Sequence, residues 1–391
     1  MGSATTPLIP PPQHEIRLDE PRRVTIGPQL GRGSMATVYR GVLQGSFGIE
    51  RAIAVKVFDV IASDETDGIV ATLAHAAREA ACIRHANVAV MLEFGMLTPV
   101  QPFALTELIE GPTLVDVLDA YAGARRRVPL DLALFIGIEI AEALVGARAA
   151  CTPEGVRLGI VHGELSPNDV ILSWSGEVKL TDFGIAAATR AASTVRSVKA
   201  LTRRIRALAP EVARGSFGDA RSDVFALGVI LHEMMLGPRF PPTLSDAEAM
   251  TYARDGIVHS SVFEPQLAPE LRVIMSRALE RDPAKRFAHA GALVYELRRV
   301  ALAMGVGDGR SFLRHALPSV FAADAPAEDV TEEIEDDARP SRVAPAPPDR
   351  FALLREGTTE SGMMRRASFA ANDESEDAVD EERGYGFRYD P

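Results

Sequence analysis

The stretch His162-Gly163-Glu164-Leu165-Ser166-Pro167-Asn168-Asp169, followed after twelve intervening residues by Asp182-Phe183-Gly184, decides the fold of this chain. It brings three carboxylates, Glu164, Asp169 and Asp182, into two short turns separated by apolar residues. Carboxylate oxygens are hard ligands of the kind that magnesium takes, and a carboxylate can also accept the proton of a hydroxyl. The two turns therefore indicate a metal-assisted reaction, and the motifs on either side show of which kind.

A glycine-rich turn comes before a strand that contains a lysine. The turn is Leu30-Gly31-Arg32-Gly33-Ser34-Met35-Ala36-Thr37-Val38, and its glycines let the backbone approach a triphosphate without interference from Cβ atoms. Strand alternation over residues 53–58 places Ala54 and Lys56 on the same face. Because a lysine within an apolar strand needs a partner, we expect Glu79, on the first helical segment, to pair with it.

The hydrophobic pattern changes once along the chain, near Gly111. Before it, strand-like segments and a single helical segment predict a small lobe over residues 23–110. After it, apolar residues at helical spacing predict a larger, mainly helical lobe over residues 111–305. The expected strands lie at 27–30, 36–43, 49–58, 90–96 and 103–109, and the helix of the small lobe lies at 68–84.

Both ends of the chain lack a core pattern. Residues 1–22 are rich in proline and are expected to form a flexible leader without a regular element. Residues 306–321 are a candidate capping segment, and residues 322–391 are expected to be an acidic, disordered tail. Residues 321–391 contain 19 acidic and 8 basic side chains, so nearly all of the chain's net charge of -12 lies there.

Composition limits the compartment and the partners. Cys82 and Cys151 have no metal-ligand spacing and are expected to be packed free thiols, which is typical of a reducing compartment. No apolar run reaches the roughly 18 to 20 uncharged residues of a membrane helix, and no signal peptide is visible. We expect a cytoplasmic protein that binds neither membrane nor nucleic acid, since the first 320 residues are nearly neutral and the tail is acidic.

Several further motifs complete the pattern, in a fixed order. They are Leu105-Thr106-Glu107-Leu108-Ile109, Ala209-Pro210-Glu211, Ser222-Asp223-Val224-Phe225-Ala226-Leu227-Gly228 and Asp282-Pro283-Ala284-Lys285-Arg286. With these, the chain from about Val24 to Met304 resembles the bacterial-type serine/threonine protein kinases. The resemblance implies an α+β, bilobal protein-kinase-like fold, with a small five-stranded antiparallel β lobe that carries one helix, a larger helical lobe and disordered termini.

The resemblance also implies ATP and Mg2+ as cofactors. Lys56 and Glu79 would pair and orient the α and β phosphates, Glu164 would stand at the position of the catalytic base, and Asp169 and Asp182 would hold magnesium. The residues expected to contact ATP are Leu30, Gly31, Arg32, Gly33, Ser34, Met35, Ala36, Thr37, Val38, Ala54, Lys56 and Ile171, with the backbone of Glu107 and Ile109 bonding adenine.

Three structural roles follow from the same resemblance. Asp223 is expected to brace the catalytic loop from below, and His162 to stack on Phe183 without taking part in proton transfer. Glu211 is expected to pair with Arg286 inside the large lobe.

The catalytic loop departs from the family pattern His-Arg-Asp-Leu-Lys-Pro-x-Asn at Gly163, Glu164, Ser166 and Asp169. The extra methylene of Glu164 moves its carboxylate by about 1 Å, and a misplacement of that order can cost about 10²-fold in rate. Ser166 removes a cation near the γ-phosphate, whereas Asp169 still offers an oxygen to a metal ion. We therefore expect a slow protein kinase that transfers the γ-phosphoryl group to serine and threonine hydroxyls.

Two other interpretations stay open at this point. The chain could be a nucleotide-binding pseudokinase that acts as a scaffold, although Lys56, Glu79 and Asp182 favour an enzyme. It could also be a small-molecule phosphotransferase, because His162-Gly163 resembles the His-Gly-Asp loop of aminoglycoside and choline kinases. The glycine-rich turn and the Ala-Pro-Glu and Asp-Pro-x-x-Arg motifs speak against this last alternative.

The segment between Gly184 and Pro210 is basic and contains no acidic residue. Its attraction to the acidic tail would be multivalent and screened by salt. We therefore hypothesise an intramolecular contact between the tail and this activation segment. Its basic residues are Arg190, Arg196, Lys199, Arg203, Arg204 and Arg206. The protein substrates are unknown from sequence.

Overall fold

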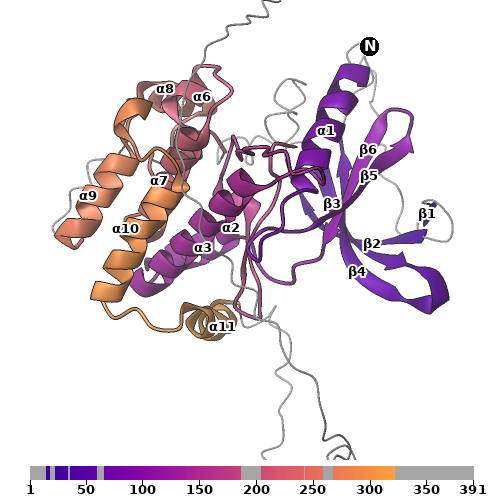
Figure 1. Cartoon of the computed structure of the whole chain (residues 1–391). Coiled ribbons are helices and arrows are strands. Elements are labelled where there is room, and N and C mark those ends of the chain that lie inside the picture. The colour runs from indigo at the N-terminus through magenta and orange to yellow at the C-terminus, as the bar shows by residue number, and fades with distance from the viewer. Residues whose placement is uncertain are drawn as a thin grey trace, which may run out of the picture. The chain divides into compact units, whose positions relative to one another are not determined.

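The strands of the N-terminal part form one antiparallel sheet in the order β1-β2-β3-β4-β6-β5 (Figure 1). The computed structural model describes residues 15–17, 23–33, 36–59, 66–185, 204–241, 243–258 and 267–321, all within one compact unit. The five predicted strands are confirmed, and helix α1 (Thr66–Ala80) packs against β5. The strands are β1 (Glu15–Arg17), β2 (Arg23–Arg32), β3 (Ala36–Gln44), β4 (Glu50–Phe58), β5 (Met91–Thr98) and β6 (Gln101–Glu107).

Strand β1 corrects the prediction that residues 1–22 form no regular element. Its three residues pair antiparallel with β2, with Glu15 opposite Thr25 and Arg17 opposite Arg23. The outer edge of β2 offers N–H and C=O groups that another strand can satisfy. A sixth strand can therefore form from a segment whose own sequence does not favour one.

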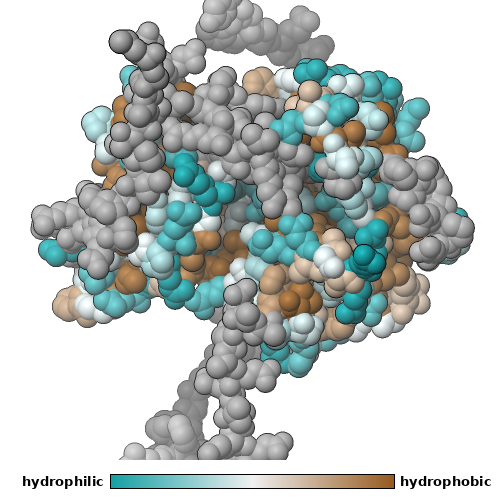
Figure 2. Space-filling model, turned by 180° about the vertical axis from the view of Figure 1, so that it is seen from behind, coloured by the Kyte–Doolittle hydropathy of each residue, from teal (hydrophilic) through white to brown (hydrophobic). Residues whose placement is uncertain are grey.

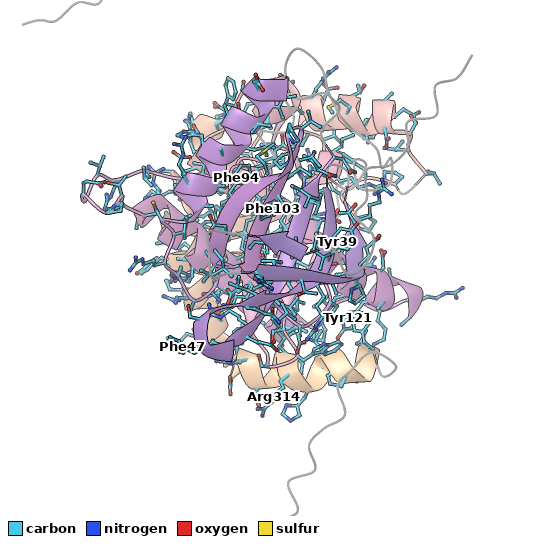
Figure 3. The ribbon with its side chains drawn as sticks, turned by 90° about the vertical axis from the view of Figure 1, so that its right-hand side faces the viewer. Tyr39, Phe47, Phe94, Phe103, Tyr121 and Arg314 are labelled. Atoms are coloured by element: carbon cyan, nitrogen blue, oxygen red, sulfur yellow. The ribbon has the colours of Figure 1, made fainter. Side chains whose placement is uncertain are left out.

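The two faces of β4 point to different surroundings. Ile53, Val55 and Val57 are buried in an apolar cluster on one face of the sheet, together with Tyr39 and Phe103 (Figure 3). The other face carries Ala54, Lys56 and Phe58, and Phe58 packs with residues of α1. The alternation predicted for this strand is confirmed, and it places Lys56 on the same side of the sheet as α1.

Helices dominate the described residues after Gly111, as the periodicity predicts. Helix α2 begins at a capping box, in which the Thr113 hydroxyl accepts from the Asp116 N–H and the Asp116 carboxylate accepts from the Thr113 N–H. The helices are α2 (Leu114–Gly123), α3 (Leu130–Ala149), α6 (Pro210–Ala213), α7 (Ala220–Met235), α8 (Asp246–Asp255), α9 (Pro269–Ala278), α10 (Ala290–Ala303) and α11 (Gly309–Val320), with 3-10 turns η1 (Ser46–Gly48), η2 (Pro167–Asp169) and η4 (Pro283–Lys285).

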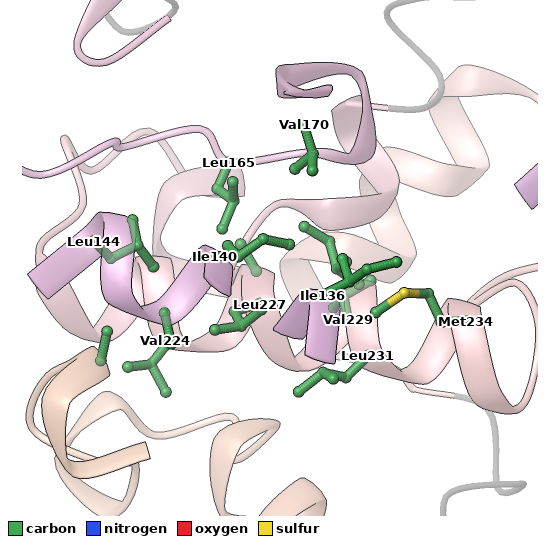
Figure 4. Packing of buried hydrophobic residues seen from close by; sticks show 14 of the residues in the cluster. Ile136, Ile140, Leu144, Leu165, Val170, Val224, Leu227, Val229, Leu231 and Met234 are labelled. Atoms are coloured by element: carbon green, nitrogen blue, oxygen red, sulfur yellow. The ribbon is translucent and has the colours of Figure 1, made fainter. Parts of the chain in front are cut away.

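Helices α3 and α7 form the centre of the large lobe. Ile140 of α3 and Leu227 of α7 lie in one buried cluster, and Leu165 of the catalytic loop and Val170, the first residue after that loop, belong to the same cluster (Figure 4). The loop leads into a two-stranded sheet, β7 (Val170–Leu172) and β8 (Val178–Leu180). The catalytic loop is therefore fixed to the main core of the lobe rather than suspended above it.

Helix α11 closes the described part of the chain, in the candidate capping segment. Leu313 and Leu317 are buried, and the ring of Phe321 meets Trp174 edge-on at 6.3 Å between centroids.

Both cysteines are free, but Cys151 is exposed rather than packed. Hydrophilic and hydrophobic residues are interspersed on the face seen in Figure 2. None of the helices in the described ranges is long and apolar enough to span a bilayer.

Candidate active site

Lys56 and Asp182 form the centre of the site. The Nζ atom of Lys56 lies 2.5 Å from Oδ2 of Asp182, and both side chains are about one-fifth exposed. Asp182 has a positive φ of 68°, a conformation that is uncommon for a residue other than glycine. Burial opposes ionisation of Asp182, but the ammonium of Lys56 outweighs it and holds the pKa of that carboxyl below its ordinary value. A charged pair therefore stands where phosphates and a metal ion are expected.

Glu79 does not pair with Lys56, which corrects the prediction from sequence. Oε1 of Glu79 lies 3.6 Å from Nε2 of His75, one turn earlier on α1, and the carboxylate is one-third exposed. The prediction required α1 to turn Glu79 toward β4. In the structure Asp182 already neutralises the ammonium, so burial of Lys56 no longer demands a second carboxylate.

The catalytic loop is held from below by Asp223 of α7. Its two carboxylate oxygens accept hydrogen bonds from the backbone N–H groups of His162 and Gly163, at 2.8 and 2.9 Å. His162 also packs against Phe183, with 5.0 Å between ring centroids, and its Nε2 lies 2.9 Å from the Thr181 carbonyl oxygen. The contacts predicted for Asp223 and for His162 with Phe183 are confirmed, and they fix the loop to the turn that carries Asp182.

The linker between the lobes lies against β7. The Leu172 N–H donates to the Pro112 carbonyl at 2.9 Å, and Ile171 pairs with Thr113. A Cβ atom on Gly111 would overlap the Leu172 carbonyl, so only glycine allows this approach. Ile171 is thereby held beside the linker, as a residue beneath an adenine should be.

The backbone groups expected to bond adenine are differently engaged. The Glu107 N–H donates to the Val90 carbonyl at 3.0 Å, and the Glu107 carboxylate pairs with Lys179 at 3.0 Å. Within the described ranges, no acceptor receives a hydrogen bond from the Ile109 N–H. Ile109 therefore retains a donor for a ligand, and Glu107 can contribute only its carbonyl.

The glycine-rich turn joins β2 to β3. The Gly33 N–H donates to the Ala36 carbonyl at 2.8 Å, and Gly31 lies opposite Val38. Val38 in turn pairs with Lys56, and Ala54 pairs with Thr106 of β6. Val38, Ala54 and Lys56 are thus brought to one face of the sheet. Ala36 and Thr37 are buried, Leu30 and Arg32 are exposed, and Ser34 and Met35 lie outside the described residues.

Arg204 lies among the carboxylates of the catalytic loop, and sequence reasoning missed it. Its Nη1 is 3.5 Å from Oε2 of Glu164, and its Nη2 is 3.3 Å from Oδ1 of Asp169. Burial would lower the pKa of the guanidinium, but Asp169 and Glu164 outweigh burial and raise the pKa of Arg204 above its ordinary value. The sequence signal for it is the excess of arginine between Gly184 and Pro210, which we assign, from sequence, to a contact with the acidic tail.

The residues at the two proposed magnesium positions fit the ion unequally. Among the residues that the structure describes, Lys56 alone pairs directly with the Asp182 carboxylate, and magnesium is often held by one or two carboxylates together with substrate phosphates. Asp169 is almost fully buried, and Ser166 donates to its Oδ2 from both N–H (2.9 Å) and Oγ (2.7 Å). Asp182 therefore suits a magnesium ion, whereas Asp169 is already surrounded by donors.

Comparison with known proteins agrees with this arrangement. The family described as protein tyrosine and serine/threonine kinase matches residues 24–293. The chain belongs to the protein kinase family. A Streptomyces coelicolor protein named as a probable serine/threonine-protein kinase is 32% identical over 70% of this chain and 40% of its own length. The serine/threonine-protein kinase PknL of Mycobacterium tuberculosis is 29% identical, over 71% of this chain and 66% of its own length.

The kinase domain also has structural relatives. The crystal structure of the Mycobacterium tuberculosis PknI kinase domain superposes with a TM-score of 0.52, covering 71% of this chain and 95% of that one at 24% identity. This likeness shows the fold alone. The kinase domain spans about two-fifths of the length of the Streptomyces relative, so that protein contains much that this chain does not match.

A buried ion pair connects separate elements of the large lobe. Arg286 donates from Nη1 and Nη2 to the two carboxylate oxygens of Glu211, at 2.7 and 2.8 Å. Burial opposes ionisation of Glu211, but the hydrogen bonds from Arg286 and Ser222 outweigh it and hold the pKa of Glu211 below its ordinary value. The predicted pair is confirmed, and it belongs to the motifs that disfavour the small-molecule phosphotransferase alternative.

Two cavities adjoin the site in the kinase domain. A space of about 20 Å³, roughly that of one water, lies behind Thr106 and is lined by Lys56, Asp182 and Phe183. A larger cavity of about 780 Å³ lies between α2 and the loop after α7, and reaches Pro167 and Arg206. The larger cavity therefore borders the catalytic loop without containing its carboxylates.

Two arginines of the basic activation segment, which is expected to contact the acidic tail, already have partners in the large lobe. Arg204 contacts the catalytic loop, and Arg206 donates to the carbonyls of Phe240 and Pro241 at 3.0 and 3.3 Å. The other basic residues of the segment, together with the acidic tail, lie outside the described residues.

Proposed function

We propose that this chain is a protein kinase that transfers the γ-phosphoryl group of Mg-ATP to serine and threonine hydroxyls of proteins. The observation that carries the proposal is the Lys56–Asp182 pair, 2.5 Å apart, beside a catalytic loop that Asp223 holds in place. An ammonium and a metal-binding carboxylate at this separation are the groups that phosphoryl transfer requires. The names of the relatives support serine and threonine as acceptors.

The residues of the site divide the work between them. Lys56 would bind the α and β phosphates, and Asp182 would hold the magnesium ion, which when bound neutralises charge on the β and γ phosphates. The side chains of Val38 and Ala54 would cover the adenine from the sheet, and Ile171 would lie on its other side. The Ile109 N–H would donate to the ring.

Glu164 would orient the acceptor hydroxyl. Its side chain is 6% exposed, and its Oε2 lies 3.5 Å from Nη1 of Arg204, which fixes the orientation of the carboxylate. In the transfer, the hydroxyl oxygen forms a bond to the γ phosphorus, the bond from phosphorus to the bridging oxygen of ADP breaks, and the hydroxyl proton passes to Glu164. Most of the rate acceleration in such transfers comes from positioning and electrostatics, so the longer side chain slows the reaction without abolishing it.

The test combines binding and transfer in three proteins: wild type, Asp182→Asn and Glu164→Asp. Wild type should bind ATP in a magnesium-dependent manner and incorporate phosphate into itself or a generic basic protein. Asp182→Asn should lose both, whereas Glu164→Asp should keep the binding and change only the rate. ATP binding without transfer, unrescued by Glu164→Asp, would instead identify a pseudokinase scaffold, and absence of binding would overturn both interpretations.

The substrate and the partner of the tail are proposals of smaller scope. The cavity beside Pro167 is a candidate site for the polypeptide that carries the acceptor hydroxyl, because it borders the catalytic loop. If the acidic tail contacts the activation segment, it must use basic residues other than Arg204 and Arg206, which have partners in the large lobe. A cytoplasmic location stays a prediction from the sequence.

A further inference from the structure

Both carboxylate oxygens of Asp169 are engaged by donors of the chain itself. Oδ2 accepts from the backbone N–H and the hydroxyl of Ser166, which closes a capping box around the turn η2. Oδ1 lies 3.3 Å from Nη2 of Arg204, and Asp169 is 1% exposed. A second magnesium ion on Asp169 would have to displace the guanidinium or share its oxygen with it. Sharing is costly because the two cations repel, and magnesium demands near-ideal octahedral geometry.

The backbone next to Arg204 is held in place by buried side chains and hydrogen bonds, and this keeps the Arg204 guanidinium beside Asp169. Ile205 and Ala207 are buried, and Nη1 of Arg239 donates to the carbonyls of Arg206 and Leu208 at 2.9 and 3.0 Å. Arg239 itself is 1% exposed, and its Nε donates to another backbone carbonyl at 2.8 Å.

Two aromatic rings complete the surroundings of Arg239. Its guanidinium lies 4.8 Å from the centroid of Phe225 and 4.6 Å from that of Phe240. A buried arginine on two rings therefore clamps the end of the activation segment, and the clamp presents Arg204 to the catalytic loop.

The position of Arg204 compensates negative charge that the catalytic loop has gained relative to the family pattern. Compared with the family pattern, Asp169 adds a negative charge where an asparagine is usual, and Ser166 removes the positive charge of a lysine. These two changes make the loop two units more negative next to the transferred phosphate. The guanidinium of Arg204 restores one positive charge at that place, and it does so through direct contact with Asp169 and Glu164.

We propose that Arg204 takes the place of the second magnesium ion, so that this kinase binds a single divalent ion per nucleotide, at Asp182. The inference rests on the proposed function, because it presupposes nucleotide binding. Arg204 acts here as a positioning residue: it neutralises Asp169 and orients Glu164 without itself holding the metal ion.

The test counts divalent ions rather than turnover. Mn2+ serves as the probe for magnesium, and its bound fraction is measured by electron paramagnetic resonance with a saturating non-hydrolysable ATP analogue. Wild type should bind one Mn2+ per nucleotide, and Arg204→Gln should bind two, because Asp169 then loses its guanidinium. Arg206→Gln is the matched control and should bind one, since the hydrogen bonds of the Arg206 side chain to described residues go to backbone carbonyls of the large lobe and not to the catalytic loop.

Each contrary result has a separate meaning. Two ions in wild type would overturn the inference, and this measurement needs no variant to fold. A single ion in a folded Arg204→Gln would show that Arg204 is not what excludes the second ion, and would overturn it as well. Failure of wild type to bind the nucleotide with any amount of Mn2+ would instead overturn the proposed function, and this inference with it.

Discussion

The Arg286–Glu211 and Lys56–Asp182 ion pairs each connect distant parts of this chain, and they stand in different surroundings. Arg286 and Glu211 meet inside the large lobe, where the arginine side chain is fully buried and makes two parallel hydrogen bonds to the carboxylate. Lys56 and Asp182 join the sheet to the turn after β8, and each is about one-fifth exposed. The first pair is the one that the motifs predict, whereas the second replaces the predicted pairing of Lys56 with Glu79.

The difference between the two pairs shows under which conditions a sequence motif determines a contact between side chains. Arg286 also donates to the backbone carbonyls of Arg221, Glu280 and Arg281, so several elements fix its position. The ammonium of Lys56 is a single point charge that pairs with whichever carboxylate is near. A pair within one packed core is therefore determined by its sequence motifs, while a pair at the junction of the sheet with the helical lobe depends on how α1 is turned.

The largest effect is expected from Arg286→Met. Removing the arginine leaves the Glu211 carboxylate without its partner, which typically costs about 3–5 kcal/mol for a buried pair. Urea denaturation should show this loss in the free energy of unfolding. Arg310→Met is the control, because the Arg310–Glu177 pair is exposed and should contribute about 0–1 kcal/mol. Equal losses in the two variants would contradict the contrast drawn between buried and exposed pairs.

Lys56→Met should act on activity more than on stability. The phosphates lose the ammonium that orients them, and removal of one such electrostatic group costs about 10²- to 10³-fold in rate. The measurement is kcat/KM for phosphate incorporation, with the free energy of unfolding determined on the same protein. A loss of unfolding free energy as large as that of Arg286→Met would show that Lys56 stabilises the fold and does not act mainly in catalysis.

Glu79→Gln tests whether the predicted pair forms during turnover. Stability should change by no more than about 0.5 kcal/mol, because within the described ranges the Glu79 side chain pairs with His75 of its own helix and with no other residue. We expect a rate about tenfold lower, equivalent to about 1.4 kcal/mol, because protein kinases require this pair when the phosphates are bound. His75→Gln frees Glu79 and should leave the rate unchanged. An unaltered rate in Glu79→Gln would mean that Lys56 works with Asp182 alone.

The smallest effect is a pH dependence of stability that comes from Glu211. The pKa of Glu211 is lower in the folded chain than in the unfolded one. At pH values between these two pKa values, the folded state therefore binds fewer protons than the unfolded state. The stabilisation is then fully present above the unfolded pKa of about 4.3 and is lost as the pH falls through the folded pKa. Glu211→Gln should lack this contribution, which is measured as a shallower fall of unfolding free energy below about pH 5. An identical fall in both proteins would assign the acid sensitivity to other carboxylates.

Particular residues show how far the sequence carried the predictions. The alternation of β4 places Lys56 opposite the buried face, and the motif spacing brings Asp223, Glu211 and Arg286 to their partners, because local geometry and core packing decide these positions. Strand β1 was missed, since its pairing depends on the free edge of β2 and not on its own residues. Arg204 was missed because its pairing with Asp169 and Glu164 depends on the tertiary fold and not on the residues next to it in the sequence.

The sequence by itself determined the family, the order of the elements and the residues that carry charge at the site. Only the tertiary structure decided which charges meet. Arg204 is thirty-five residues from Asp169 along the chain, and nothing in its neighbourhood distinguishes it from the other arginines of the segment. Periodicity and motif spacing record local geometry, whereas a long side chain with several rotatable bonds takes the partner that the packed backbone places within its reach.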